Sequence, residues 1–180
     1  GKVDWRKLLQ SLLPHVDIFL PSIDEIIYML ASDKLKGNSG DISSEHLSLI
    51  GEELMEMGAK VVVLKLGSRG LYICTTSLSK LHKLGKATPV SLSDWDNREI
   101  HVPCFKVAVR GTTGAGDTTI AGFLAAFLRG LPIEACATMA VAVGACSVES
   151  IDAISGIRSW EETKNRVDQG WLRTEDVITF

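Results

Sequence analysis

Helix-like and strand-like hydrophobic patterns alternate along the chain. Apolar residues three and four positions apart indicate amphipathic helices, and short β-branched runs indicate buried strands. The predicted helices cover residues 4–13, 22–31, 44–57, 114–129, 133–147 and 160–167, and the predicted strands cover residues 16–20, 60–66, 71–74 and 105–109. The run at 60–66 suits a parallel sheet that is buried on both faces. This alternation predicts an α/β fold.

The remaining segments lack a clear period. Residues 33–42 are polar and contain glycine, so they predict a loop. Residues 77–99 contain Pro89 and a polar run, and we expect a hairpin or a surface excursion there. Trp95 lies in that polar run, which favours an exposed loop aromatic over a platform that stacks on a sugar.

Composition and charge narrow the class of protein. The chain has 180 residues, 46% hydrophobic and 23% charged, as expected for one globular domain with a substantial core. A net charge of −3 gives no general attraction for nucleic acid or anionic lipid. The sequence shows no apolar run near the ~20 residues that span a bilayer and no basic-then-apolar leader. We therefore expect a cytoplasmic protein without nucleic-acid or membrane partners. Because the sequence begins with Gly1 rather than Met, we also expect a processed N-terminus or a part of something longer.

Cysteine and histidine positions give no sign of a transition-metal site. No two cysteines form the close pair that zinc sites or redox motifs need, so we expect free thiols in a reducing compartment. No two histidines share a helical face at positions i and i+4.

A glycine-rich turn between a predicted strand and a predicted helix carries the candidate chemistry. The first amides of a helix have no intrahelical partners, and the helix dipole adds positive charge there. Gly114, Ala115 and Gly116 carry little or no side chain, so an anion can approach these amides closely. Asp117 follows in the first helical turn. An anion hole beside a carboxylate suits phosphoryl transfer to a hydroxyl, in which the carboxylate takes the proton.

Two other phosphate-binding motifs do not fit this turn. A P-loop needs a lysine directly after its last glycine, and Asp117 stands there instead. A dinucleotide fingerprint needs glycine where this chain has Thr119. The residues alone also leave open a plain structural turn in which Asp117 only complements the helix dipole.

Three segments together resemble a known family. Residues 111–117 (Gly-Thr-Thr-Gly-Ala-Gly-Asp) and the helix after them resemble the second signature of the ribokinase-like (PfkB-type) carbohydrate kinases, whose usual form begins with Asp. Residues 16–25 resemble that family's strand and Pro-Asn-x-x-Glu motif, and residues 63–70 resemble its strand and Thr-x-Gly-x-x-Gly nucleotide loop. The resemblance covers about residues 1–168. It implies a three-layer α/β/α fold with a mostly parallel central sheet.

The resemblance also implies roles for individual residues. Asp117 would be the catalytic base, and the amides of Gly114, Ala115 and Gly116 would form the anion hole. Glu25 would organise Mg²⁺ near the phosphates of ATP. The nucleotide site would be lined by Lys65, Gly67, Ser68, Gly70 and Thr113, with the helix near Ala142 and the loop at 151–157 flanking the adenine.

The chain departs from the family pattern at three positions. Gly111 replaces an Asp that commonly helps to bind a monovalent cation, so K⁺ activation is in doubt, although backbone carbonyls could still supply a site. Ser22 replaces Asn, and Ser22 with Glu25 also fits a helix capping box. Lys65 replaces Thr, and it either pairs with an ATP phosphate or faces solvent. Ser68 and Arg69 are equally compatible with a plain turn.

The resemblance implies an ATP- and Mg²⁺-dependent kinase that acts on a hydroxyl of a sugar or a related small polyol. The alternative is a nucleotide- or sugar-binding protein on the same scaffold that does not catalyse. Two family features that hold the sugar, a Gly-Gly motif and a small β-sheet lid, are not found in the sequence. We therefore expect residues 1–180 to be the C-terminal, ATP-binding portion of one kinase domain, which binds nucleotide weakly and turns over sugar poorly. The complete protein could form a homodimer.

Overall fold

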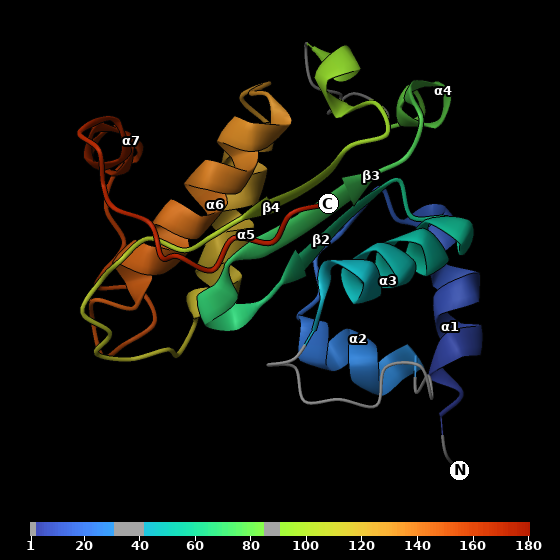
Figure 1. Cartoon of the computed structure of the whole chain (residues 1–180), viewed down its shortest axis with the longest axis horizontal. Coiled ribbons are helices and arrows are strands. Elements are labelled where there is room, and N and C mark those ends of the chain that lie inside the picture. The colour runs from blue at the N-terminus through green and yellow to red at the C-terminus, as the bar shows by residue number, and fades with distance from the viewer. Residues whose placement is uncertain (1–2, 31–41, 85–90) are drawn as a thin grey trace.

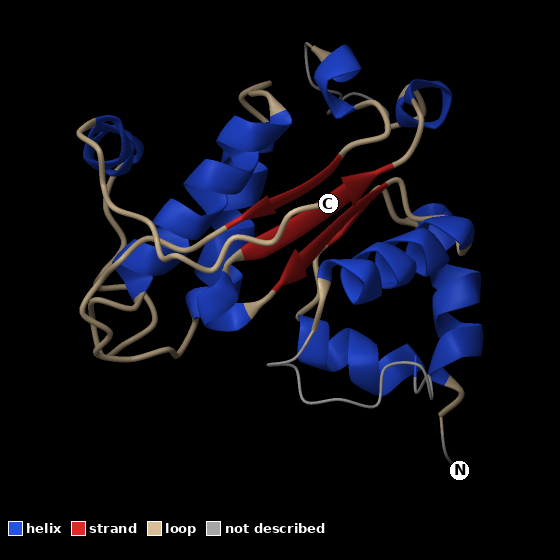
Figure 2. Cartoon of the chain, viewed as in Figure 1, coloured by secondary structure: helices blue, strands red, loops and turns tan. Residues whose placement is uncertain are grey.

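A four-stranded sheet with the order β1-β2-β3-β4 lies at the centre of the molecule (Figure 2). The computed structural model describes residues 3–30, 42–84 and 91–180, so the loop predicted at 33–42 lies outside it except for Ile42. The strands are β1 (Ile18–Phe19), β2 (Val61–Lys65), β3 (Leu71–Thr75) and β4 (Glu99–Val102).

The strand directions differ in part from the mostly parallel sheet that we expected. β1 runs parallel to β2, in the register Ile18 to Val61, whereas the β2–β3 and β3–β4 pairs are antiparallel. For the β2–β3 pair, the physical reason is the length of the connection. Only residues 66–70 join β2 to β3, and a parallel crossover needs a dozen or more residues.

Helices cover both faces of the sheet, which confirms the predicted three-layer α/β/α arrangement (Figure 1). One layer holds α1 (Trp5–Leu12), α2 (Ile23–Leu30) and α3 (Ser44–Glu56). The opposite layer holds α5 (Ala115–Phe127) and α6 (Ile133–Ser147), which pack against each other. Within the described residues, no helix is long and apolar enough to cross a bilayer.

The central strands explain how one sequence builds two cores. Val61 and Val63 of β2 pack into the cluster under α5 and α6, while Val62 and Leu64 pack into the cluster under α1 to α3. Alternate side chains point to opposite faces of a strand, so an uninterrupted apolar run fills both cores. The doubly buried strand predicted at 60–66 is confirmed.

The segment at 77–99 is described except for residues 85–90. Its described part forms the short helix α4 (Leu78–Leu81) and a 3₁₀ turn (Leu92–Trp95) before β4 begins, so of the two predicted alternatives the hairpin is not seen there. Trp95 is fully buried, so the expectation of an exposed aromatic is wrong. Leu92 and Trp95 lie three residues apart, which is one 3₁₀ turn, and therefore share its inner face. The Trp95 ring packs edge-on against Phe127, with ring centroids 5.3 Å apart.

The prediction of a strand at 105–109 is also wrong. Phe105 makes only an isolated bridge with Arg173, and the residues that follow have no regular structure until α5. Pro103 directly follows β4 and has no N–H to extend the ladder. The last helix, α7 (Trp160–Asp168), lies where it was predicted.

Candidate active site

The three candidate motifs meet where β1 and β2 end. Because these strands are parallel, their carboxyl ends lie at the same edge of the sheet. Ser22, just after β1, forms a bridge with Lys65, the last residue of β2, and the Lys65 amide donates to the Pro21 carbonyl at 3.1 Å. The Lys65 side chain reaches the third motif, since a Cβ placed on Gly116 would lie 3.6 Å from Nζ.

The glycine-rich turn adopts a conformation that requires glycine. Gly114 is the N-cap of α5 and has a φ of 76°, in the left-handed region. A Cβ on Gly114 would lie 2.6 Å from the Cβ of Ala153, which belongs to the loop after α6. The turn is therefore shaped both by its own backbone and by a segment distant in sequence.

Of the three amides expected to form the anion hole, one is already hydrogen-bonded within the turn. The Ala115 amide already donates to the Thr112 carbonyl at 3.2 Å. Among the described residues, the amides of Gly114, Gly116 and Asp117 have no acceptor. The helix start therefore offers the Gly116 and Asp117 amides, and its side-chain-free surface is open apart from the Lys65 side chain.

Lys65 brings a positive charge to this cradle. Its side chain is half-buried, and its Cδ and Cε would lie 3.9–4.0 Å from a Cβ on Gly116. Within the described part of the chain, no carboxylate lies within 4 Å of the ammonium. The structure places the ammonium beside the cradle, within reach of an anion bound there. Asp117 is exposed in the first turn of α5.

Glu25 is held in an ionised state close to the same edge. Its Oε2 accepts from the Ser22 amide at 2.6 Å, and its own amide donates to Ser22 Oγ at 3.3 Å. These two bonds confirm the capping box. The bond from the Ser22 amide lowers the pKa of Glu25, and the nearby charge of Lys65 lowers it further. Among the described residues, no group of three or more His, Cys, Asp or Glu could hold a metal ion without other ligands.

The predicted nucleotide loop forms one exposed 3₁₀ turn after β2. This turn covers Gly67–Arg69, and the Leu66 amide closes it by donating to the Gly70 carbonyl at 2.9 Å. Gly67 and Ser68 are exposed, whereas the Arg69 guanidinium turns away and donates to the Ile42 carbonyl at 2.9 Å. Thr113 is exposed on the neighbouring glycine-rich turn.

The two segments expected to flank the adenine lie in different surroundings. Ala142 is fully buried in the core under α6. The loop at 151–157 packs against the glycine-rich turn, and a Cβ on Gly111 would lie 2.6 Å from the Ile151 carbonyl oxygen. An Asp at position 111, as in the usual family motif, would therefore collide with this loop. The sequence carries no local signal for this contact, because it joins segments about forty positions apart.

An open pocket of about 380 Å³ lies beside the loop after α6. Three of its lining residues, Ser155, Gly156 and Ile157, belong to the loop expected to flank the adenine. The others are Ala108, Arg110, Glu149, Ser150 and Arg158. We place the phosphate end of the candidate site at the cradle rather than in this pocket, because the anion donors, Lys65 and Asp117 all lie at the cradle.

Comparison with known proteins agrees with this geometry. The profile described as pfkB family carbohydrate kinase matches residues 2–160. An uncharacterized sugar kinase of Archaeoglobus fulgidus is 31% identical over 149 residues, which cover 83% of this chain and 46% of that protein. The crystal structure of a ribokinase from Thermotoga maritima is similar with a TM-score of 0.63 and 27% identity, over 88% of this chain and 44% of that one. A ribokinase of Arabidopsis thaliana complexed with ribose and ATP matches with a TM-score of 0.67 and 23% identity, over 87% of this chain and 42% of that one. The chain thus spans less than half the length of these relatives.

Proposed function

The chain belongs to the pfkB family of carbohydrate kinases, and from this premise we propose that its site takes part in phosphoryl transfer from ATP to a hydroxyl of a sugar or a related small polyol. One observation carries the proposal. The Lys65 ammonium lies beside the acceptor-free amides of Gly116 and Asp117 at the start of α5. A cation and oriented amides at one helix start form a binding site for phosphate.

The cradle would bind the transferred phosphoryl group. The Gly114, Gly116 and Asp117 amides would donate to its oxygens, and the helix dipole and Lys65 would stabilise the negative charge that develops there. Gly67, Ser68 and Thr113 form the exposed rim on which the rest of the nucleotide would lie, and the buried Gly70 shapes the turn beneath it.

Asp117 would act as the base. In the transfer, the substrate oxygen bonds to the γ-phosphorus while the bond from that phosphorus to the β-phosphate oxygen breaks, and ADP leaves. The Asp117 carboxylate accepts the proton of the attacking hydroxyl. Its exposure at the first turn of α5 keeps it accessible to a hydroxyl beside the cradle.

Glu25 fits a magnesium ion that is held mainly through water and phosphate. Mg²⁺ at phosphate sites usually takes one or two carboxylates and keeps several waters. Glu25 supplies one carboxylate, which its lowered pKa keeps ionised at neutral pH. When bound, the ion would neutralise charge on the phosphates. Lys65 and Glu25 would then determine the net charge of the protein next to the phosphates.

The substitution Asp117→Asn tests this function on the 180-residue chain. Calorimetric titration with MgADP measures binding, and a coupled assay over a panel of sugars and polyols measures turnover. We expect Asn to lower any turnover at least about a hundredfold, because general base catalysis is lost. ADP affinity should stay equal or increase, since a negative charge beside the phosphates is removed.

Glu161→Gln is the matched control, because Glu161 is an exposed carboxylate in the first turn of α7. It should change neither binding nor turnover. Absence of measurable MgADP binding by the wild-type chain would refute the proposed function, and turnover within tenfold of wild type in Asp117→Asn would refute the role of the base.

A further inference from the structure

The last ten residues of the chain run beside the segment that follows β4. We call residues 171–180 the C-terminal tail; they lie beyond the region that matches the family. The Lys106 amide donates to the Leu172 carbonyl and the Thr174 amide donates to the Cys104 carbonyl, both at 2.8 Å. The red end of the chain follows β4 and stops near the middle of the sheet (Figure 1). The tail thus runs antiparallel to the segment after β4 and is joined to it by these bonds and by the bridge between Phe105 and Arg173.

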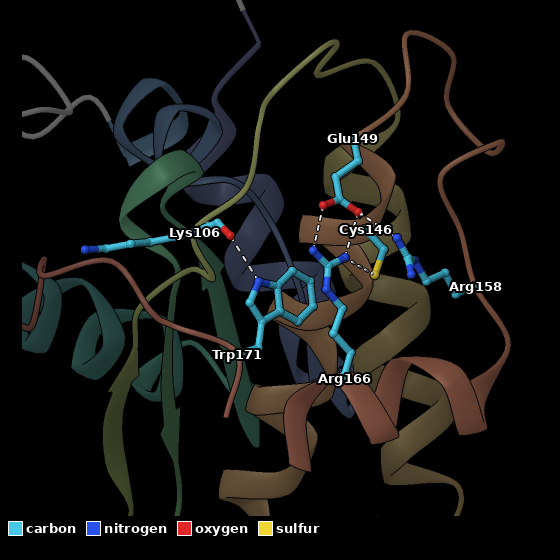
Figure 3. Close-up of polar contacts among 6 residues, drawn as sticks. All are labelled: Lys106, Cys146, Glu149, Arg158, Arg166 and Trp171. Atoms are coloured by element: carbon cyan, nitrogen blue, oxygen red, sulfur yellow. Dashed lines mark hydrogen bonds and ion pairs between the residues drawn. The ribbon is translucent and has the colours of Figure 1, made fainter. Parts of the chain in front are cut away.

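Trp171 fixes the start of the tail. Its Nε1 donates to the Lys106 carbonyl at 3.0 Å, and its ring stacks on Phe105 with centroids 4.4 Å apart. The Arg166 guanidinium lies 3.5 Å from the centre of the same ring and donates twice to Glu149, each bond 2.7 Å long (Figure 3). The tail is therefore held to the body of the protein at its first residue.

The segment that the tail pairs with also contacts the nucleotide loop. Cys104 Sγ lies 3.5 Å from the Gly67 carbonyl oxygen. His101 Nε2 lies 2.6 Å from the Arg69 carbonyl oxygen. Residues 101–104 therefore lie between the tail on one side and the predicted nucleotide loop on the other.

The His101 ring joins the two sides directly. Its Nδ1 accepts from the amide of Ile178, in the tail, at 3.1 Å. A carbonyl can only accept, so Nε2 must donate to Arg69, and both bonds form only in the neutral tautomer with its proton on Nε2. A protonated ring carries N–H at both nitrogens and cannot accept from Ile178.

The surroundings favour the neutral ring. Burial lowers the pKa of His101 and the charge of Arg69 lowers it further, against the opposing effects of the Arg69 carbonyl bond and of Asp176 in the tail. The residue that pairs with His101 from β3 is Tyr72, which is uncharged. Both hydrogen bonds of His101 are therefore present near neutral pH. The bond that Nδ1 accepts from the Ile178 amide is lost as the pH falls through the lowered pKa of His101.

We propose that the C-terminal tail positions the nucleotide loop through His101, a positioning residue. Near neutral pH its ring is hydrogen-bonded both to the Arg69 carbonyl and to the Ile178 amide, and in acid the bond to Ile178 is lost. The effect on nucleotide binding rests on the proposed function, because it takes residues 67–70 as part of the nucleotide site. The mechanical coupling between the tail and that loop does not depend on it.

Hydrogen exchange tests the coupling without any nucleotide. The variants are a deletion of residues 178–180, which removes the Ile178 amide from the chain end, and His101→Leu, whose new side chain has neither a donor nor an acceptor. His82→Leu is the control, since His82 is exposed on the surface. At pH 7.5 we expect the Arg69 and Gly70 amides, which donate to the Leu66 and Gly67 carbonyls, to exchange about fivefold faster in both variants, as for the loss of one ordinary hydrogen bond. The control should match the wild type. Unchanged exchange in the deletion variant overturns the proposal.

ADP titrations test the consequence for binding. NMR first gives the midpoint of the His101 titration in the wild-type chain. One pH unit above it, the deletion variant should bind ADP about fivefold more weakly than the wild type. One unit below it, the two should bind equally, because the wild type has lost the same bond. Protonation of ADP itself affects both chains alike and cancels.

An affinity gap that is the same at both pH values would refute the role of His101 protonation. If the wild type binds no ADP at either pH, the proposed function fails, while the exchange experiment still decides the coupling.

Discussion

The substitution Lys65→Met most directly tests the phosphate site. Methionine keeps the apolar stem that lies against Gly116 but removes the charge. A phosphate oxygen that accepts from the Gly116 amide would lie on the order of 4 Å from Nζ. At that distance, two unit charges interact by about 4 kcal/mol at an effective dielectric constant of about 20. Because Lys65 is only half-buried, solvent screening reduces this to roughly 1–2 kcal/mol.

That magnitude predicts about a tenfold loss of ADP affinity. Calorimetric titration at low ionic strength measures it, and the difference between Lys65→Met and wild type should shrink as salt is added. Lys65→Arg should retain most of the affinity, because it keeps a cation on a long stem. NMR titration should also show a higher pKa for Glu25 in Lys65→Met, since the lysine charge helps to lower it in the wild type.

Lys80→Met is the matched control, because Lys80 is exposed on α4. It should bind ADP as the wild type does. If Lys65→Met binds within twofold of the wild type at low salt while folding normally, Lys65 does not contact phosphate.

Two further predictions concern stability and are measured by urea unfolding. Gly111→Asp should lower the free energy of unfolding by about 1–3 kcal/mol, because its Cβ would press on the Ile151 carbonyl, and a stability equal to wild type would show that this loop yields freely. Trp95→Ala should lower it by about 3–5 kcal/mol, because the fully buried ring packs against Phe123 and Phe127, and a loss below 1 kcal/mol would contradict that packing.

The sequence predicts best where local signals are dense. The helix predicted at 133–147 has the bounds of α6, because Pro132 marks its start and its alanine-rich run favours helix throughout. The doubly buried strand at 60–66 is equally clear, since its apolar run leaves no polar face. The glycine-rich turn is readable because its glycines mark it locally, although the loop after α6 also shapes it.

Features that depend on contacts between distant segments cannot be predicted from local sequence patterns. The burial of Trp95 follows from which face of a short 3₁₀ turn meets α5, and its polar neighbours hide that choice. The orientation of Lys65 depends on where α5 begins in space. The pairing of the tail with residues 101–106 joins segments about seventy positions apart, and no local pattern marks it.

The packing of the loop after α6 against the glycine-rich turn bears on how the cradle works. Ala153 meets Gly114, and the Ile151 carbonyl meets Gly111, so the turn is held from outside by a second segment. The amides that we propose to bind phosphate are thus preorganised: they are oriented when the chain folds, and little reorganisation is left for the moment when a charged ligand arrives. Substitutions in residues 150–153 should therefore alter phosphate affinity without touching the phosphate, by changing how rigidly its donors are aimed.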